Sequence, residues 1–128
     1  MRAVTIPVSY GEAADRIAIL SIKNARIRDE AKLDHVRTEL ALISDAFFAH
    51  VELKPGFDTL FAELKQVNET LWQIEDDIRA LEAKSDFGED FVRLARLVYQ
   101  TNDKRAAVKR AIDELLGSEL REEKSYNP

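Results

Sequence analysis

The sequence predicts an all-α fold, an antiparallel bundle of about four helices dominated by a long hairpin formed by the last two. Three observations lead to this prediction. Apolar residues recur at steps of three and four along four separate segments, as on the buried face of a helix. Only 4 Gly and 3 Pro occur among the 128 residues, so few positions interrupt these segments. With 45% hydrophobic and 34% charged residues, the chain is expected to form one helical domain over residues 1–128.

The first two segments have recognisable helix starts. A capping box, Ser9 followed three residues later by Glu12, is predicted to begin a helix over about 10–28. Asp29 is predicted to cap the second helix, because Asp is a favoured N-cap residue. The apolar stripe of that helix stops before Pro55-Gly56, a pair typical of a turn.

The last two segments predict the hairpin. The third helix is expected over about 57–83, where the apolar stripe is almost unbroken. A second capping box, Asp86 to Glu89, is predicted to begin the fourth helix, and Gly117 is predicted to end it in the left-handed conformation. Because residues 84–88 alone connect them, the two helices should be antiparallel neighbours.

The lengths of the helices predict an uncovered surface. Each arm of the hairpin should be roughly 40 Å long, whereas the first two helices should reach only about 30 Å. Either the chain termini or a second copy must cover the remainder, and we expect a homodimer. The alternation of Val4, Ile6 and Val8 also allows a short N-terminal strand, with Pro7 limiting its pairing.

Charge is distributed unevenly over the predicted hairpin. Residues 58–82 hold seven acidic and two basic side chains, and residues 93–110 hold six basic and one acidic. The third and fourth helices should therefore attract each other, although each exposed pair contributes only about 0.2–1 kcal/mol. This interpretation makes the third helix the first partner of the basic run Lys104, Arg105, Lys109 and Arg110.

The apolar stripe of the fourth helix is interrupted by Thr101 and Arg105. Polar residues at such positions can fix register and oligomeric state. Alternatively, they belong to a pocket for a small anion, onto which Asn24 and the tail 123–126 also converge. A buried Arg105 needs a partner, either a carboxylate of Asp15, Glu69 or Glu75 or a bound anion. The candidate ligand-binding residues are Asp15, Lys23, Asn68, Glu75, Asn102, Arg105 and Lys109.

Several functional classes are not supported by the composition. There are no cysteines and only 2 histidines, no phosphate-binding loop and no common hydrolase motif, so no catalytic residue, metal ligand or cofactor is predicted. The net charge of −5 argues against binding to nucleic acid or to an anionic membrane. No apolar run has the roughly 20 residues of a membrane span, and a cytoplasmic protein is expected.

Four blocks of sequence together resemble a family of small all-helical bacterial proteins classed as a domain of unknown function. The blocks are SYGEAADRIAILSIK, LKQVNETLWQIEDDIR, VYQTNDKRAAVK and GSELREEKSY. The resemblance implies a short, helical, cytoplasmic protein and carries no known chemistry. Many of the pattern positions are polar, which favours a polar site.

Two hypotheses for the function follow. The first is a non-catalytic interaction or dimerisation module that binds a protein partner or a second copy of itself. The second is a protein that binds a small anion bearing a phosphate or carboxylate, or an all-helical enzyme, with a polar site between its helices centred on Arg105. In either case the pairing of Arg105 decides how the polar interruption is interpreted.

Overall fold

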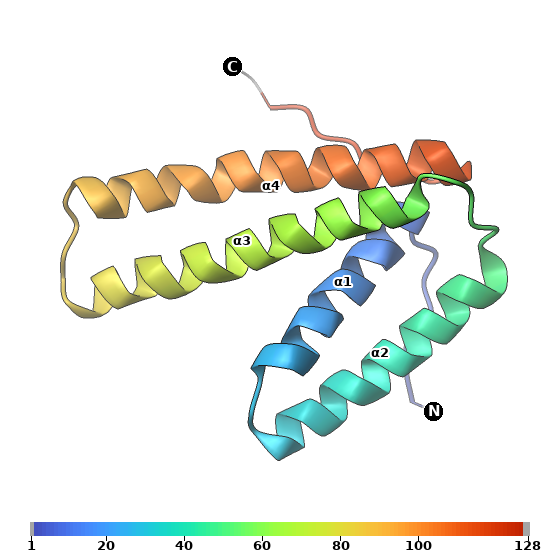
Figure 1. Cartoon of the computed structure of the whole chain (residues 1–128), viewed down its shortest axis with the longest axis horizontal. Helices are drawn as coiled ribbons and strands as arrows, with labels where there is room; N and C mark the ends of the chain where they lie inside the picture. Colours follow the sequence, from blue (N-terminus) through green and yellow to red (C-terminus); the bar gives the residue numbers. More distant parts are fainter. Residues whose placement is uncertain (1, 127–128) are drawn as a thin grey trace.

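The computed structural model describes residues 2–126 and consists of four helices (Figure 1). The prediction of an all-α bundle with a dominant hairpin is confirmed. The bounds of the third helix agree with the prediction, and the first helix ends two residues earlier than predicted. The helices are α1 (Tyr10–Arg26), α2 (Glu30–His50), α3 (Phe57–Ala83) and α4 (Glu89–Leu116).

The four helices form two hairpins of unequal length. Figure 1 shows α3 and α4 side by side over their whole length, with α1 and α2 leaning against one end of the pair. The first helix packs against all three others, whereas α2 packs mainly on α1. The molecule therefore has a thick end built from four helices and a thin end built from two.

None of the helices within residues 2–126 combines the length and the apolar character that a membrane span needs.

The hydrophobic core lies in the thick end, where α1 crosses the long hairpin. Its centre is Leu64 of α3 and Ile112 of α4, both with no exposed surface. Phe47 of α2 contacts Phe57 of α3, with ring centroids 5.8 Å apart. The buried members of the core are Ala14, Ile17, Ala18, Phe47, Val51, Phe57, Leu64, Val108, Ile112 and Leu116.

Three of the predicted helix caps are confirmed and one is wrong. Asp29 caps α2, and its Oδ1 accepts a hydrogen bond from the Lys32 amide at 3.0 Å. Ser9 Oγ accepts a hydrogen bond from the Glu12 amide at 3.0 Å, and Gly117 adopts the left-handed conformation with φ of 72°. The predicted capping box at Asp86 does not form, because Gly88 is the residue that caps α4. Asp86 Oδ1 accepts instead from the Gly88 amide at 3.2 Å, so its side chain stabilises the turn two residues on.

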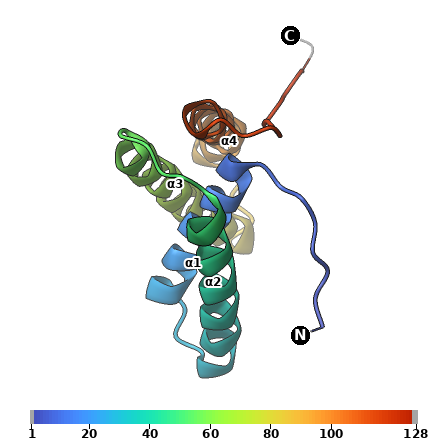
Figure 2. The same cartoon turned by 90° about the vertical axis from the view of Figure 1, so that its right-hand side faces the viewer.

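The N-terminal segment, residues 2–9, is extended but forms no strand, so that prediction is wrong. Residues 2–126 contain no strand with which it could pair. Figure 2 shows the segment standing away from the helices. Its apolar side chains remain open to solvent, with Val4 87% and Ile6 65% exposed.

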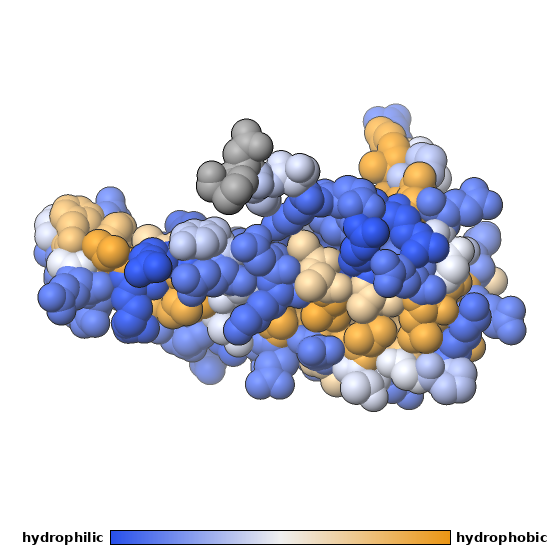
Figure 3. Space-filling view, turned by 90° about the horizontal axis from the view of Figure 1, so that it is seen from above, coloured by the Kyte–Doolittle hydropathy of each residue, from blue (hydrophilic) through white to orange (hydrophobic). Residues whose placement is uncertain are grey.

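The thin end of the long hairpin is not covered by α1 or α2, as the helix lengths predict. We call residues 77–100 the outer hairpin. Within it only Leu94 is buried. Five further apolar residues of the inter-helix seam are only partly buried, and Figure 3 shows apolar side chains at the surface of this end. These partly buried residues are Ile78, Leu81, Phe91, Leu97 and Val98.

Candidate functional site

The site begins with a close approach of two backbones. Gly11, in the first turn of α1, lies directly against α4. A Cβ atom at Gly11 would overlap the carbonyl oxygen of Lys109 and would lie 2.9 Å from Asp113 Oδ1. Only glycine permits this contact, which brings the polar face of α1 onto the polar stripe of α4.

Asp15 lies one turn after Gly11 and has no exposed surface. Its carboxylate is paired with the guanidinium of Arg105 through Nε, at 3.0 and 3.1 Å to the two oxygens, and through Nη2. Asn68 of α3 donates a further hydrogen bond to Asp15 Oδ1 at 2.8 Å. The carboxylate therefore links α1 to both helices of the long hairpin. Such a bidentate, charge-assisted pair is strong because it fixes both distance and orientation.

Asp113 is a second acidic residue with no exposed surface. Its Oδ1 accepts a hydrogen bond from the Gly11 amide at 2.6 Å, and its Oδ2 accepts from the Glu122 amide at 2.9 Å. Ser118 Oγ accepts from the Tyr10 amide at 3.2 Å. Because the first amides of a helix have no partner within it, α4 and the tail complete the start of α1. The negative charge of Asp113 also suits the positive end of the helix dipole.

Lys109 forms the third polar contact between α1 and α4, and its side chain is only 8% exposed. Its ammonium lies 2.5 Å from Glu12 Oε2 and 3.2 Å from Glu122 Oε2. The tail continues along α4, where Lys124 lies 3.7 Å from Asp103. The tail therefore folds back as expected, and it covers Lys109 rather than Arg105.

Four of the candidate ligand-binding residues are directly connected. Asp15 bonds to Arg105 and Asn68, and Arg105 Nη1 has a long contact of 3.4 Å with Asn102 Oδ1. Lys109 belongs to the separate contact with Glu12. Lys23 and Glu75 do not bond to this cluster and line a neighbouring hollow, described below.

Asn24 does not join the cluster. Its side-chain oxygen accepts a hydrogen bond at 3.1 Å from Nε of Arg37 in α2. Both side chains are exposed, and the contact joins α1 to α2 at the surface. The expectation that Asn24 converges on the pocket is therefore wrong.

The expectation that the basic run pairs with the third helix is also wrong. Arg105 and Lys109 pair with α1, and Arg110 pairs with Glu114 of its own helix at 3.1 Å and with Glu123 of the tail at 2.5 Å. Within residues 2–126, no ion pair joins this basic run to α3. The reason is geometric: α1 lies against the polar face of α4 and supplies the carboxylates.

Three residues of the polar contacts between α1, α4 and the tail were not predicted from the sequence. They are Asp113, Glu122, and Glu12 in its role as an ion-pair partner. A signal was present in the spacing. Thr101, Arg105, Lys109 and Asp113 follow one another at steps of four and so share one face of α4. Two cations followed by an acid on one face of a helix indicate that another segment of the chain supplies groups of opposite polarity to that face.

A hollow of about 350 Å³, which we call the α1–α3 crevice, opens beside the network. Arg105 of α4 is one of its lining residues, and the others come from α1 and α3. A second hollow of about 290 Å³ lies on the α2 side of α1 and shares Arg105 and Lys23 with the first. The residues lining the α1–α3 crevice are Ile19, Ile22, Lys23, Asn68, Leu71, Trp72, Glu75, Asp76 and Arg105.

The buried network is satisfied without any ligand. Within residues 2–126, every buried side-chain nitrogen and oxygen has a hydrogen-bond partner. No group of three acidic or histidine side chains in this part of the chain could hold a metal ion. The arrangement therefore acts first as a structural joint that fixes α1 to α3 and α4.

The carboxylates around Arg105 and Lys109 keep these two cations charged. The hydrogen bond that Arg105 donates to Asp15, opposed by burial, raises the pKa of Arg105 above its ordinary value. Burial by itself lowers the pKa of Lys109. The hydrogen bond and the charge of Glu12, with Asp15 and Glu122 nearby, outweigh this effect and raise the pKa above 10.5.

We expect the stabilising contribution of Lys109 to be constant below pH 10.5 and to be lost as the pH rises through the folded pKa. The free energy of unfolding of the wild type and of Lys109→Met would be measured in urea between about pH 8 and about pH 11.5. The difference between their free energies of unfolding should be constant up to pH 10.5 and should shrink above it. A difference that vanished by about pH 9 would contradict the raised pKa.

Comparison with known proteins gives a match to a family model. The model of a family of unknown function (DUF6165) matches residues 4–128, which confirms the resemblance to a domain of unknown function. No curated protein and no solved structure matches the chain.

Proposed function

The chain belongs to the DUF6165 family, and from its geometry we propose that it is a helical interaction module that pairs with a second copy of itself through the outer hairpin. The observation that carries this proposal is the uncovered apolar seam of residues 77–100, in which only Leu94 is buried. A pair of helices can shield only one side of each helix. Apolar side chains that remain partly exposed along one surface are typical of an interaction site.

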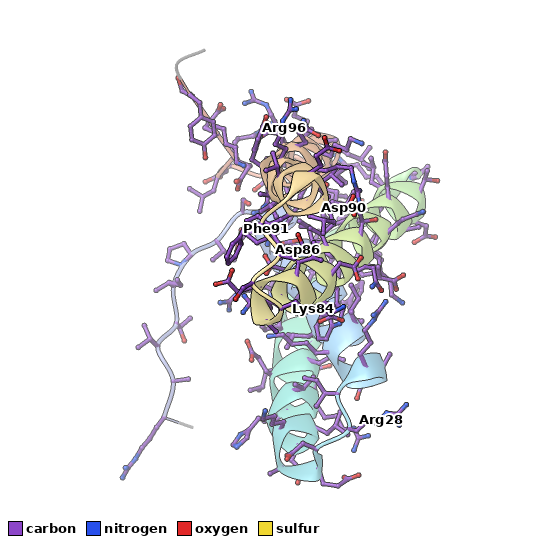
Figure 4. All side chains as sticks on the ribbon, turned by 90° about the vertical axis from the view of Figure 1, so that its left-hand side faces the viewer. Arg28, Lys84, Asp86, Asp90, Phe91 and Arg96 are labelled. Atoms are coloured by element: carbon purple, nitrogen blue, oxygen red, sulfur yellow. The ribbon has the colours of Figure 1, made fainter. Side chains whose placement is uncertain are left out.

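The surface of the outer hairpin adds exposed apolar groups to the seam. Phe87 is 55%, Val92 53% and Tyr99 55% exposed. A hollow of about 420 Å³ follows α4 here, with Val92 and Leu97 among its lining residues and Arg93 and Arg96 beside them. Figure 4 looks onto this end and shows Arg96 on the side of α4 turned away from α3. Apolar groups flanked by arginines are typical of protein interfaces.

The apolar seam favours a second copy as the partner, because the same surface is then buried on both chains. The outer hairpin itself is nearly neutral, with five acidic and four basic side chains in residues 77–100, so net charge does not oppose such pairing. A two-fold axis that sets two outer hairpins antiparallel brings the seam of each copy onto the seam of the other. Every favourable contact then occurs twice.

We expect Val92→Glu to convert the dimer into a monomer, because the substitution places an unpaired carboxylate in the apolar contact. Sedimentation velocity should give the wild type twice the 14.6 kDa of one chain and the variant a single chain mass. The dissociation constant should rise at least about tenfold, which corresponds to about 1.4 kcal/mol.

Leu42→Glu provides the matched control. Leu42 is 46% exposed on α2, far along the chain from the outer hairpin, and this variant should remain dimeric. Circular dichroism of both variants should show unchanged helix content. A wild type that sediments as one chain, or a Leu42→Glu variant that dissociates as readily as Val92→Glu, would exclude the outer hairpin as the interface.

A further inference from the structure

The α1–α3 crevice combines an apolar wall with cationic groups. Ile22 of α1 and Leu71 and Trp72 of α3 are among the residues that line it. Lys23 and Arg105 contribute the positive charge. Ligand sites in proteins share this character, a mostly apolar lining with a few placed polar groups, and have volumes from about 300 Å³ upward. The volume of about 350 Å³ suits a small organic molecule.

The two cations differ in how far their charge is already compensated. Arg105 is paired with Asp15 through Nε and Nη2, and its Nη1 has only the 3.4 Å contact with Asn102. Lys23 makes no ion pair within 4.0 Å with any residue of 2–126. The crevice therefore offers one uncompensated ammonium and a guanidinium N–H with spare capacity.

We infer that the crevice binds a small organic monoanion, a carboxylate attached to a flat apolar body. The carboxylate would lie between Lys23 and Arg105, and the apolar body would lie on Trp72 and Leu71. This position matches both halves of such a ligand to the groups that line the crevice.

The charge of the rim favours a monoanion over a phosphate. Glu75 and Asp76 also line the crevice, and Glu75 is held by Arg79 at 3.1 Å. A phosphate group, with about −1.5 to −2 charges, would meet these carboxylates with only one free ammonium to offset it.

Binding in the crevice can be followed through Trp72, because it lines the crevice and is the single tryptophan of the chain. We expect phenylacetate to change the Trp72 fluorescence and the indole N–H resonance saturably, with a dissociation constant on the order of 1 mM. Acetate, which lacks the apolar body, and phenethylamine, which carries the opposite charge, should bind at least about tenfold more weakly. Equal affinity for phenethylamine, or no saturable change with phenylacetate, would overturn the inference.

Lys23→Gln tests the charged contact. This variant should bind phenylacetate at least about tenfold more weakly, equivalent to about 1.4 kcal/mol, whereas Lys32→Gln on the exposed surface of α2 should bind like the wild type. The monomeric Val92→Glu variant should also bind normally, because the crevice lies outside the outer hairpin. Equal affinities of Lys23→Gln and the wild type would overturn the inference, as would equal losses in the two lysine variants.

Discussion

Replacing Asp15 with alanine is expected to lower the free energy of unfolding by about 3–5 kcal/mol, the usual cost of removing one partner of a buried ion pair. Asp15 has no exposed surface and accepts hydrogen bonds from both Arg105 and Asn68. Its loss leaves a guanidinium and an amide without their partner at the junction of three helices. Urea unfolding monitored by circular dichroism would measure the change.

Glu75→Gln is the matched control, because it also removes one acidic partner of an arginine. The pair of Glu75 with Arg79 is exposed and lies within one helix, so the expected cost is only about 0.3–0.5 kcal/mol. The double variant Asp15→Ala/Arg105→Met should lose less stability than the two single variants together, because it leaves no unpaired charge. If Asp15→Ala cost no more than Glu75→Gln, the joint would not hold the helices together.

Replacing Gly11 with alanine is expected to destabilise the protein by about 2 kcal/mol or more. Alanine is favoured over glycine within a helix by about 1 kcal/mol. The added Cβ, however, would overlap the Lys109 carbonyl oxygen and crowd Asp113 Oδ1 at 2.9 Å. Overpacking against a backbone atom costs typically 1–3 kcal/mol, and the displaced helix would also lose the hydrogen bond from the Gly11 amide to Asp113, worth about 1 kcal/mol more.

Gly88→Ala provides the comparison for this prediction. Gly88 has an ordinary φ of −76°, and the nearest atom to an added Cβ is Asp86 Oδ1 at 3.3 Å, on an exposed turn. We expect a change within about 1 kcal/mol, measured by thermal and urea unfolding. A Gly11→Ala variant more stable than the wild type would show that α1 does not approach α4 as closely as described.

The helices could be predicted because their signals are local. The apolar stripe of residues 57–83 has the period of a helix throughout, and α3 begins and ends where the stripe does. Ser9 and Gly117 act on amides and carbonyls within a few residues of themselves, so their roles also follow from the local sequence. Asp86 failed as a cap because the same side chain can stabilise a turn instead, a choice that depends on the path of the loop.

The partners of the charged residues could not be predicted, because they depend on which helix lies against which. The balance of charge placed the partner of Arg105 on the neighbouring arm of the hairpin. In the structure α1 lies against both helices of the hairpin at that point, and Asp15 of α1 is the partner. The sequence had identified Asp15 as one of three candidate carboxylates, but residue spacing alone did not distinguish it from Glu69 and Glu75.

The contacts of Asp113 and Glu122 could not be predicted from the sequence around them. Asp113 accepts from the amide of Gly11, 102 residues earlier, and Glu122 pairs with Lys109, 13 residues earlier. No local pattern connects such positions. The spacing of Arg105, Lys109 and Asp113 showed only that they share a face. The close approach at Gly11 is what brings that face into contact with α1.

Amide hydrogen exchange at two protein concentrations most directly tests the claim that a second copy packs on the outer hairpin. The amides of residues 77–100 should exchange more slowly at the higher concentration, because association buries them, while those of α2 should exchange at the same rate at both. Outer-hairpin rates that did not change with concentration, or protection that appeared on α2 instead, would contradict the proposed mode of association.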